Sequence, residues 1–240
     1  MPTGNNRSAM RRLKIWLKNH GLRRSSVPLV RLRKLSAKWF LTSYITGRQR
    51  RLIVDSWDPV RYGSIFLALE QVSNARIPGD IAECGVYRGS LSRFIHATLP
   101  DRRMYLFDTF EGFDQRDAAA GSDSRFRDTS VEGVLGRIGD TTNIEIRKGL
   151  FPATARGLEG CTFALVVIDF DKYEPTLEAL RFFYPRMSPS GFVFVHDYNS
   201  PESDWACSRA LNEFLADRPE TPISIPDGWG SAVFRKIRHA

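Results

Sequence analysis

Cysteine is scarce in this chain of 240 residues, and its pattern excludes a disulfide framework and a structural zinc site. The three cysteines, Cys84, Cys161 and Cys207, are odd in number and far apart, and no C-x-x-C pair occurs. A disulfide framework needs an even set of cysteines, and a structural zinc site needs closely spaced ligand pairs. The sequence therefore predicts reduced, buried cysteines and a cytoplasmic location.

Long apolar runs are also missing. No stretch of about 18 consecutive apolar residues occurs, so we expect no transmembrane helix. A hydrophobic content of 42% and a charged content of 26% are typical of an ordinary globular protein. The length suits one large domain with an extension.

Acidic residues are absent from residues 1–51, which carry 14 Lys and Arg side chains. The other 189 residues carry 21 basic and 27 acidic side chains, so the net charge of +8 comes entirely from this tail. A uniformly basic groove, as expected for a nucleic-acid enzyme, is therefore not supported. We expect a basic N-terminal extension over residues 1–51 and a globular domain over residues 52–240.

The tail admits several interpretations. Met10, Leu13, Trp16 and Leu17 fall on one helical face, as in an amphipathic helix that lies on an anionic membrane. Its arginine-rich, acid-free composition also resembles a transit peptide. A partly disordered basic extension, or a segment that contacts a partner or nucleic acid, are the alternatives.

Strand and helix patterns alternate after the tail. Strands are expected at residues 80–84, 104–107, 143–147, 163–168, 192–195, 222–225 and 231–237. Helices are expected at residues 62–75, 90–98, 131–138, 175–186 and 203–216. This alternation predicts an α/β fold with a doubly wound, mainly parallel, seven-stranded sheet that ends in an antiparallel hairpin.

The first expected strand contains Glu83 and leads through Gly85 and Gly89 into a helix. A dinucleotide fingerprint would read G-x-G-x-x-G, whereas this segment reads E-x-G-x-x-x-G. An acid before the first glycine would repel a pyrophosphate and suit the ammonium group of a methionine moiety. The next strand ends at Asp108, where a carboxylate accepts hydrogen bonds from ribose hydroxyls. The pattern favours S-adenosylmethionine over NAD, and plain turn glycines are the alternative.

Two later strands end abruptly in acid. Asp169 and Asp171 follow the apolar run 163–168, and His196 and Asp197 follow the run 192–195. Ligands bind in the crevice at the carboxyl ends of parallel strands, so these side chains are expected in one place. The sequence therefore predicts a metal and acid–base site, with capping of strand ends and helix N-termini as the alternative.

Five segments together resemble the macrocin O-methyltransferase (TylF-type) family. They are G-D-I-A-E-C-G-V-Y-R-G at 79–89, L-F-D-T-F-E-G-F at 106–113, K-G-L-F-P-A-T at 148–154, I-D-F-D-K-Y-E at 168–174 and H-D-Y at 196–198. The resemblance covers roughly residues 60–240. It implies a Rossmann-like class I methyltransferase that uses S-adenosylmethionine to methylate a hydroxyl, often on a sugar of a natural product, with a magnesium ion.

The resemblance also implies roles for individual residues. The implied cofactor-binding residues are Glu83, Gly85, Tyr87, Gly89, Ser90, Asp108 and Thr109. Asp169, His196 and Asp197 would ligate a divalent metal. Asp171 would be the general base, and His196 is a second candidate for acid–base work.

Position 196 departs from the family pattern, in which an aspartate is expected. Magnesium prefers oxygen ligands, whereas imidazole suits manganese, iron or zinc better. His196 could therefore bind a softer metal such as Mn²⁺ or Fe²⁺, or act as an acid–base or orienting group. In a third interpretation Mg²⁺ binds through Asp169 and Asp197, and His196 forms a hydrogen bond nearby. A catalytically degenerate module that binds S-adenosylmethionine or acts as a scaffold tethered by its tail is the alternative to an enzyme.

The expected partner is a small-molecule or glycan hydroxyl acceptor, and no nucleic acid is expected. Trp229 and Tyr198 could line its pocket, and the loop 114–128 could be a mobile lid; hairpin packing and a solvated loop are the alternatives. A peripheral contact of residues 1–51 with an anionic membrane and a homo-oligomer are both compatible with the sequence.

Overall fold

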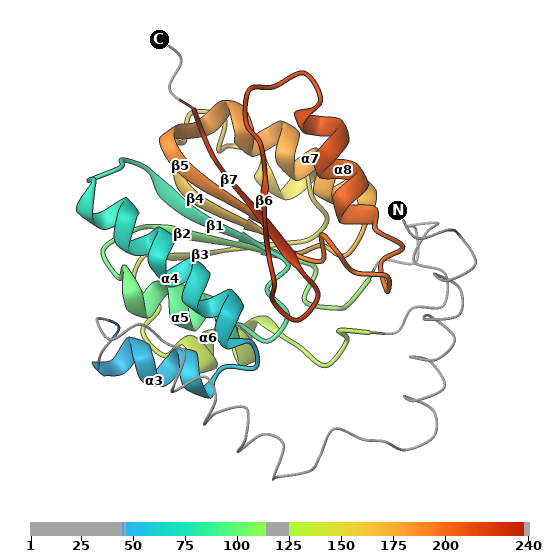
Figure 1. Ribbon diagram of the computed structural model, residues 1–240. Helices are drawn as coiled ribbons and strands as arrows, with labels where there is room; N and C mark the ends of the chain where they lie inside the picture. Colours follow the sequence, from blue (N-terminus) through green and yellow to red (C-terminus); the bar gives the residue numbers. More distant parts are fainter. Residues whose placement is uncertain (1–44, 46, 114–124, 238–240) are drawn as a thin grey trace.

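The computed structural model describes residue 45 and residues 47–113 and 125–237 (Figure 1). The amphipathic helix expected near Trp16, and most of the expected lid, lie outside the described residues. None of the helices in the described part of the chain combines the length and the apolarity that crossing a bilayer requires.

A seven-stranded sheet forms the centre of the molecule (Figure 1). Its strands are β1 Asp80–Cys84, β2 Met104–Asp108, β3 Ile144–Lys148, β4 Phe163–Ile168, β5 Met187–Val195, β6 Ile223–Ile225 and β7 Ser231–Arg235. The strand order is β3-β2-β1-β4-β5-β7-β6, with β1 to β5 parallel and β7 antiparallel to both β5 and β6. The predicted fold, a mainly parallel sheet that ends in a hairpin, is confirmed.

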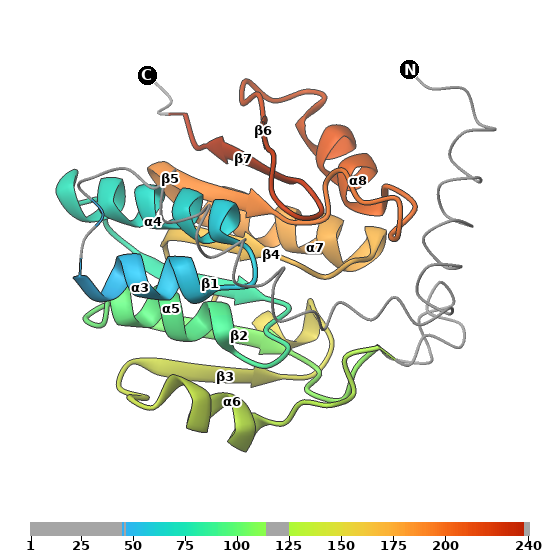
Figure 2. The same ribbon diagram turned by 60° about the horizontal axis from the view of Figure 1, so that its bottom comes forward.

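Helices cover both faces of the sheet (Figure 2). They are α3 Gly47–Asp55, α4 Pro59–Asn74, α5 Ser90–Thr98, α6 Val131–Ile138, α7 Tyr173–Phe183 and α8 Ala206–Leu215, with short 3₁₀ turns at Ala153–Ala155 and Tyr184–Arg186. Helices α3 to α6 bury their apolar stripes in one core layer, and α7 and α8 bury theirs in the other. All six residues of β4 are buried, because a strand covered on both faces needs a continuous apolar run.

The start of the folded region crosses the expected boundary between tail and domain. Helix α3 runs from Gly47 to Asp55, and its Ile53 is fully buried in the same core layer as α4. Helix α4 then begins at Pro59, whose fixed φ suits the first helical position. The Asp58 carboxylate caps it by accepting from the backbone N–H groups of Val60 and Arg61, at 3.1 Å each.

Backbone hydrogen bonds align the carboxyl ends of the central strands. The N–H of Gly85 donates to Phe107, and the N–H of Asp169 donates to Cys84. The N–H of His196 donates to Ile168 in the same way, at 2.8 Å. The strand order changes direction between β1 and β4, and such switch points open a crevice for ligands. The residues that follow β1, β2, β4 and β5 therefore meet at one edge.

Candidate active site

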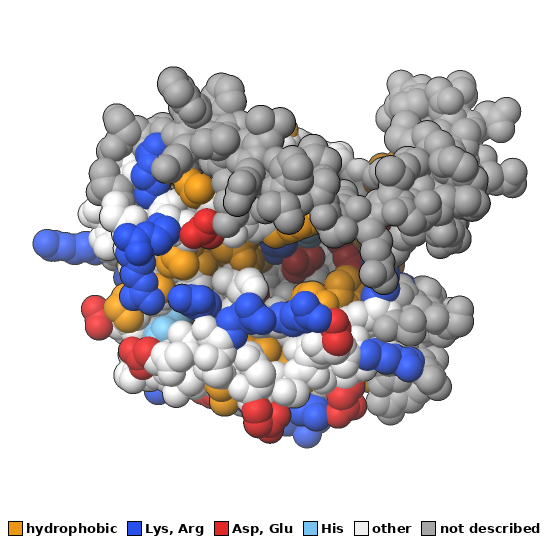
Figure 3. All heavy atoms as spheres, turned by 90° about the horizontal axis from the view of Figure 1, so that it is seen from below, with side chains coloured by type: hydrophobic (Ala, Val, Ile, Leu, Met, Phe, Trp, Pro, Cys, Tyr) orange, Lys and Arg blue, Asp and Glu red, His pale blue; other side chains and the backbone are white. Residues whose placement is uncertain are grey.

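A cavity of about 510 Å³ opens at this edge of the sheet. Seen from below, acidic side chains lie at the bottom of a hollow that is flanked by hydrophobic and basic side chains (Figure 3). Its wall contains the predicted residues Gly85, Tyr87, Asp108, Thr109, Asp169, Asp171, His196, Asp197 and Trp229. One cavity therefore contains both the expected cofactor site, after β1 and β2, and the expected metal and acid–base site, after β4 and β5.

Steric contacts within the protein explain the two glycines that follow β1. Gly85 has a φ of 87°, and a Cβ there would overlap the backbone oxygen of Asp169. Gly89 has a φ of 72°, and a Cβ there would lie 2.8 Å from a methyl group of Val134 in α6. Both glycines thus allow close packing of neighbouring elements in left-handed backbone conformations.

Asp108, at the end of β2, organises the loop on the cofactor side of the cavity. One carboxylate oxygen accepts from the N–H groups of Val86 and Tyr87, each at 2.8 Å, and the other accepts from Phe110 at 2.7 Å. The Thr109 hydroxyl also lies 3.5 Å from Oδ1 of Asp108, but its single proton is directed to Gly112 at 2.5 Å. An ionised carboxylate has about four acceptor positions, so the three backbone bonds leave capacity for one hydroxyl. Thr109 lines the cavity and donates to the backbone oxygen of Gly112.

Three of the predicted cofactor residues do not line the cavity: Glu83, Gly89 and Ser90. Glu83 is only 1% exposed, and burial raises the pKa of its carboxyl to about 8. Its predicted contact with a methionine ammonium group stays a prediction. Tyr198, which was expected to line the acceptor pocket, does not line the cavity. Its hydroxyl donates to Asn212 of α8, and the hydroxyl of Tyr173 donates to Glu213 of the same helix.

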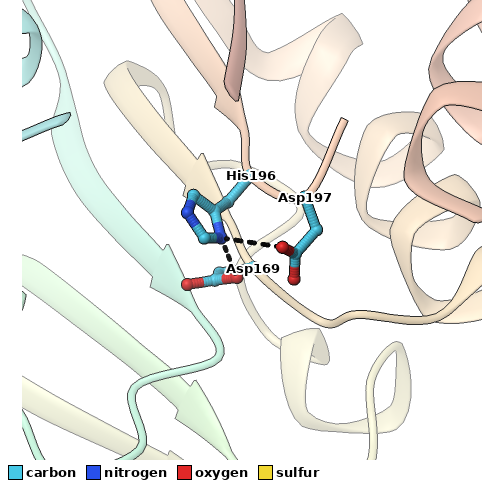
Figure 4. A group of neighbouring side chains, drawn as sticks. All are labelled: Asp169, His196 and Asp197. Carbon is cyan, nitrogen blue, oxygen red and sulfur yellow. Dashed lines mark hydrogen bonds and ion pairs between the residues drawn. The ribbon is translucent and has the colours of Figure 1, made fainter. Parts of the chain in front are cut away.

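Asp169, His196 and Asp197 form a compact cluster at the ends of β4 and β5 (Figure 4). The Nδ1 atom of His196 lies 2.9 Å from Oδ1 of Asp169 and 3.6 Å from Oδ1 of Asp197. Asp197 has a φ of 56°, a left-handed conformation that aspartate tolerates better than most residues. The imidazole edge therefore faces both carboxylates, as expected for ligands that share one ion.

Arg61 completes the cluster, and no local sequence pattern predicts its place there. Its guanidinium reaches from the first turn of α4 and donates to Oδ2 of Asp169 at 2.8 Å. Burial opposes ionisation of Asp169, but the charges of His196 and Arg61 outweigh it and hold the pKa of Asp169 well below its usual value. Burial and Arg61 both disfavour a charged His196, but Asp169 outweighs them and raises the pKa of His196 to about 9.

Asp171 lies in the same cavity wall, two residues after Asp169. Its φ of 60° shows that the chain has left the strand, so its side chain does not simply repeat the direction of Asp169. Burial and the neighbouring carboxylate of Asp197 raise the pKa of Asp171 well above its usual value. The guanidinium of Arg125, 3.9 Å away, acts in the opposite direction. A carboxylate with a raised pKa is a stronger proton acceptor.

The donor atoms of the cluster fit a divalent cation. One imidazole nitrogen and two carboxylate oxygens lie within 4.8 Å of one another. A mixed nitrogen and oxygen set suits Mn²⁺, Fe²⁺ or Zn²⁺, and the two carboxylates alone also suit Mg²⁺. Both oxygens of Asp169 already have protein partners, so a cation would compete with His196 and Arg61 for them.

Two tryptophans lie in the wall of the cavity. The ring of Trp229, in the turn between β6 and β7, is centred 6.4 Å from the ring of His196. Trp57 precedes helix α4 and is 51% exposed, which is unusual for so large an apolar side chain. Trp57 was not predicted, because no local pattern links it to the strand ends.

Comparison with known proteins gives a consistent result. Residues 60–236 match the family model described as macrocin O-methyltransferase (TylF). A 4'-O-methyltransferase from Streptomyces olivaceus, which acts on 8-demethyl-8-(2,3-dimethoxy-α-L-rhamnosyl)-tetracenomycin C, is 30% identical over 213 residues, 75% of this chain and 78% of that one. Mycinamicin III 3''-O-methyltransferase from Micromonospora griseorubida is 27% identical over 64% of this chain and 67% of its own.

The fold agrees with solved structures. The O-methyltransferase NovP matches with a TM-score of 0.63 and 26% identity, over 75% of this chain and 81% of its own. A calicheamicin methyltransferase, CalS11, matches with a TM-score of 0.60 and 19% identity, over 88% of this chain and 93% of its own. The chain therefore belongs to the macrocin O-methyltransferase family and is an S-adenosylmethionine-dependent O-methyltransferase.

Proposed function

We propose that this enzyme methylates a hydroxyl on the sugar of a glycosylated small molecule. The names of the relatives support a sugar acceptor, since two of them act on glycosylated natural products. The observation that carries the proposal is the single cavity shared by the Asp108 loop and the strand-end cluster. Its wall also holds Trp57 and Trp229, and aromatic faces pack well against the apolar faces of sugar rings.

The residues at the two sides of the cavity would divide the work. S-adenosylmethionine supplies a methyl group on a sulfonium, so the acceptor oxygen must attack in line and lose its proton. Asp108 would accept a bond from a ribose hydroxyl and fix the methyl donor. Asp171 would take the acceptor proton as the new carbon–oxygen bond forms and the methyl carbon–sulfur bond breaks, which leaves S-adenosylhomocysteine. Positioning both reactants in one site supplies much of the rate.

We infer that Asp169, His196 and Asp197 hold a divalent cation during this reaction. Such a cation would lower the pKa of a sugar hydroxyl, which is otherwise a weak acid. The compact donor set supports this role, and the choice among Mg²⁺, Mn²⁺ and Fe²⁺ depends on His196. Arg61 would keep Asp169 ionised and oriented.

The cellular setting stays a prediction. Cys84, Cys161 and Cys207 are free, which supports a reducing cytoplasm. Contact of residues 1–51 with a membrane surface, and assembly into a homo-oligomer, can be tested by liposome binding and by light scattering of the full chain.

A coupled assay for S-adenosylhomocysteine tests the proposed activity. The purified chain would be offered a panel of free sugars, nucleotide sugars and glycosides, with EDTA or with each of Mg²⁺, Mn²⁺ and Fe²⁺. Turnover of a glycoside that metal stimulates and EDTA suppresses is expected. Absence of turnover despite S-adenosylmethionine binding would instead favour the degenerate, scaffold-like module. Turnover that EDTA leaves unchanged would remove the metal from the mechanism.

Replacing Asp108 by alanine should weaken S-adenosylmethionine binding by about 10–100-fold. Charged hydrogen bonds contribute about 1.5–3 kcal/mol each, and the variant loses the ribose contact as well as the three bonds that shape the loop. Titration calorimetry measures the effect. Asp101→Ala is the matched control, because Asp101 is exposed and precedes the opposite end of β2. Unchanged affinity in Asp108→Ala would contradict the ribose assignment.

A further inference from the structure

One hydrogen bond joins two distant parts of the cavity wall. The backbone N–H of Gly228, in the turn between β6 and β7, donates to Oδ2 of Asp58 at 2.5 Å. The two residues are 170 positions apart in the sequence. The turn lies beside the start of α4 in both ribbon views (Figures 1 and 2). Asp58 itself is buried, with 6% exposure, and does not line the cavity.

The two oxygens of the Asp58 carboxylate have different partners. Oδ1 accepts from Val60 and Arg61 and so caps helix α4, whereas Oδ2 reaches across to Gly228. A helix cap needs only one oxygen, and serine or asparagine would serve as well. The second bond therefore needs an explanation beyond helix stability.

Each end of the bond lies next to a residue of the cavity. Trp57 precedes Asp58, and Trp229 follows Gly228, and both tryptophans line the cavity. Arg61, one turn further along α4, contacts Asp169, and the ring of Trp229 lies near that of His196. Asp58 thus connects the start of α4 with the turn between β6 and β7, and each of these segments contacts the cluster of Asp169, His196 and Asp197.

Position 228 is adapted to this contact. A Cβ on Gly228 would lie 2.7 Å from Oδ2 of Asp58, closer than side chains normally approach. A side chain at position 228 would therefore require the Asp58 carboxylate to move. The short Cβ distance and the hydrogen bond both result from the same close contact between Gly228 and the Asp58 carboxylate.

We propose that Asp58 is a positioning residue. Through its bond to Gly228 it holds Trp57 and Trp229 together, and the two tryptophans form one wall that binds the acceptor. This proposal rests on the proposed sugar O-methyltransferase function. The wall takes the apolar side of a glycoside. Three basic side chains line the described cavity wall. Arg61 pairs with Asp169, Arg125 lies 3.9 Å from Asp171, and Lys172 lies over the ring of Phe113, which disfavours a nucleotide-linked sugar whose diphosphate would need cations.

Three variants separate the bond from the helix cap. Asp58→Ser keeps a capping oxygen but lacks the second oxygen, and Asp58→Ala loses both. Gly228→Ala keeps both oxygens of Asp58 but places a methyl group against Oδ2, so it disrupts the bond from the other side. With a glycoside acceptor, Asp58→Ser and Gly228→Ala should each raise the acceptor KM by about tenfold, with kcat and the Kd for S-adenosylmethionine changed by less than about twofold. The double variant should be no worse than either single one, because both remove the same contact.

Hydrogen exchange gives a readout that does not depend on turnover. The amides of residues 223–231 should exchange faster in Asp58→Ser than in the wild type, while those of α4 stay protected. Unchanged exchange, an unchanged acceptor KM, or additive effects in the double variant would overturn the proposal. If the wild type methylates no glycoside, the proposed function fails, and faster exchange in Asp58→Ser would still establish the link itself. A nucleotide sugar turned over in preference to every glycoside would overturn the assigned acceptor class.

Discussion

Replacing Asp171 by asparagine is expected to lower kcat by roughly 10²–10⁴-fold, the usual contribution of general base catalysis. Asparagine cannot take a proton, yet it has nearly the same size. It also tolerates the left-handed backbone that Asp171 adopts, with a φ of 60°. The affinity for S-adenosylmethionine should stay within about twofold, since Asp108 and its loop lie on β2 and the β1 turn.

The pH dependence provides a second test of the same residue. A base must be ionised, so the rate should fall as the pH drops through the pKa of Asp171, which burial and Asp197 raise above its usual value. This acid limb should disappear from the residual activity of Asp171→Asn. Asp217→Asn is the control, because Asp217 is exposed and does not line the cavity. Full activity in Asp171→Asn would remove the base from the mechanism.

Much of the fold follows from local patterns. The continuous apolar run 163–168 predicts a strand buried on both faces, and β4 has those bounds. Glycine and proline turns locate the hairpin of β6 and β7. Other boundaries depend on tertiary contacts. Strand β5 begins at Met187, five residues before the expected start, where Met187 pairs with Phe163 and Ser188 donates a hydrogen bond to Pro78. A stretch with Ser, Pro and Ser shows no strand periodicity by itself.

The residues of the site also divide into those that local patterns predict and those that depend on tertiary contacts. Acids directly after parallel strands must meet at one edge, so the sequence predicts the proximity of Asp169, His196 and Asp197. Arg61 lies in α4 and Trp57 in the segment before it, and nothing in the local sequence of Arg61 reports a partner more than 100 positions away. An Asp-Pro pair such as Asp58-Pro59 is typical of a helix start, although we expected this helix only from residue 62. It does not reveal that the same aspartate also binds Gly228.

Replacing His196 by aspartate is expected to change which metal the enzyme prefers. The variant offers three carboxylates at the ends of β4 and β5, a set that suits Mg²⁺, in place of two carboxylates and an imidazole. We expect its affinity for Mg²⁺ to rise by about 10–100-fold and its relative preference for Mn²⁺ to fall. Calorimetry with Mg²⁺, and the electron paramagnetic resonance signal of free Mn²⁺, measure both affinities without turnover.

The control for this exchange is His196→Asn, which adds an oxygen ligand without adding charge. It should gain much less Mg²⁺ affinity than the aspartate variant, because the attraction between Mg²⁺ and a carboxylate is largely ionic. In the wild type the Nδ1 of His196 faces both carboxylates, so a ligand at this position is directed at the same ion. If aspartate at position 196 left both metal affinities unchanged, the cluster would not be a metal site. The buried contacts of Asp169 with Arg61 and His196 would then be its whole function, as an ion network that fixes the floor of the acceptor pocket.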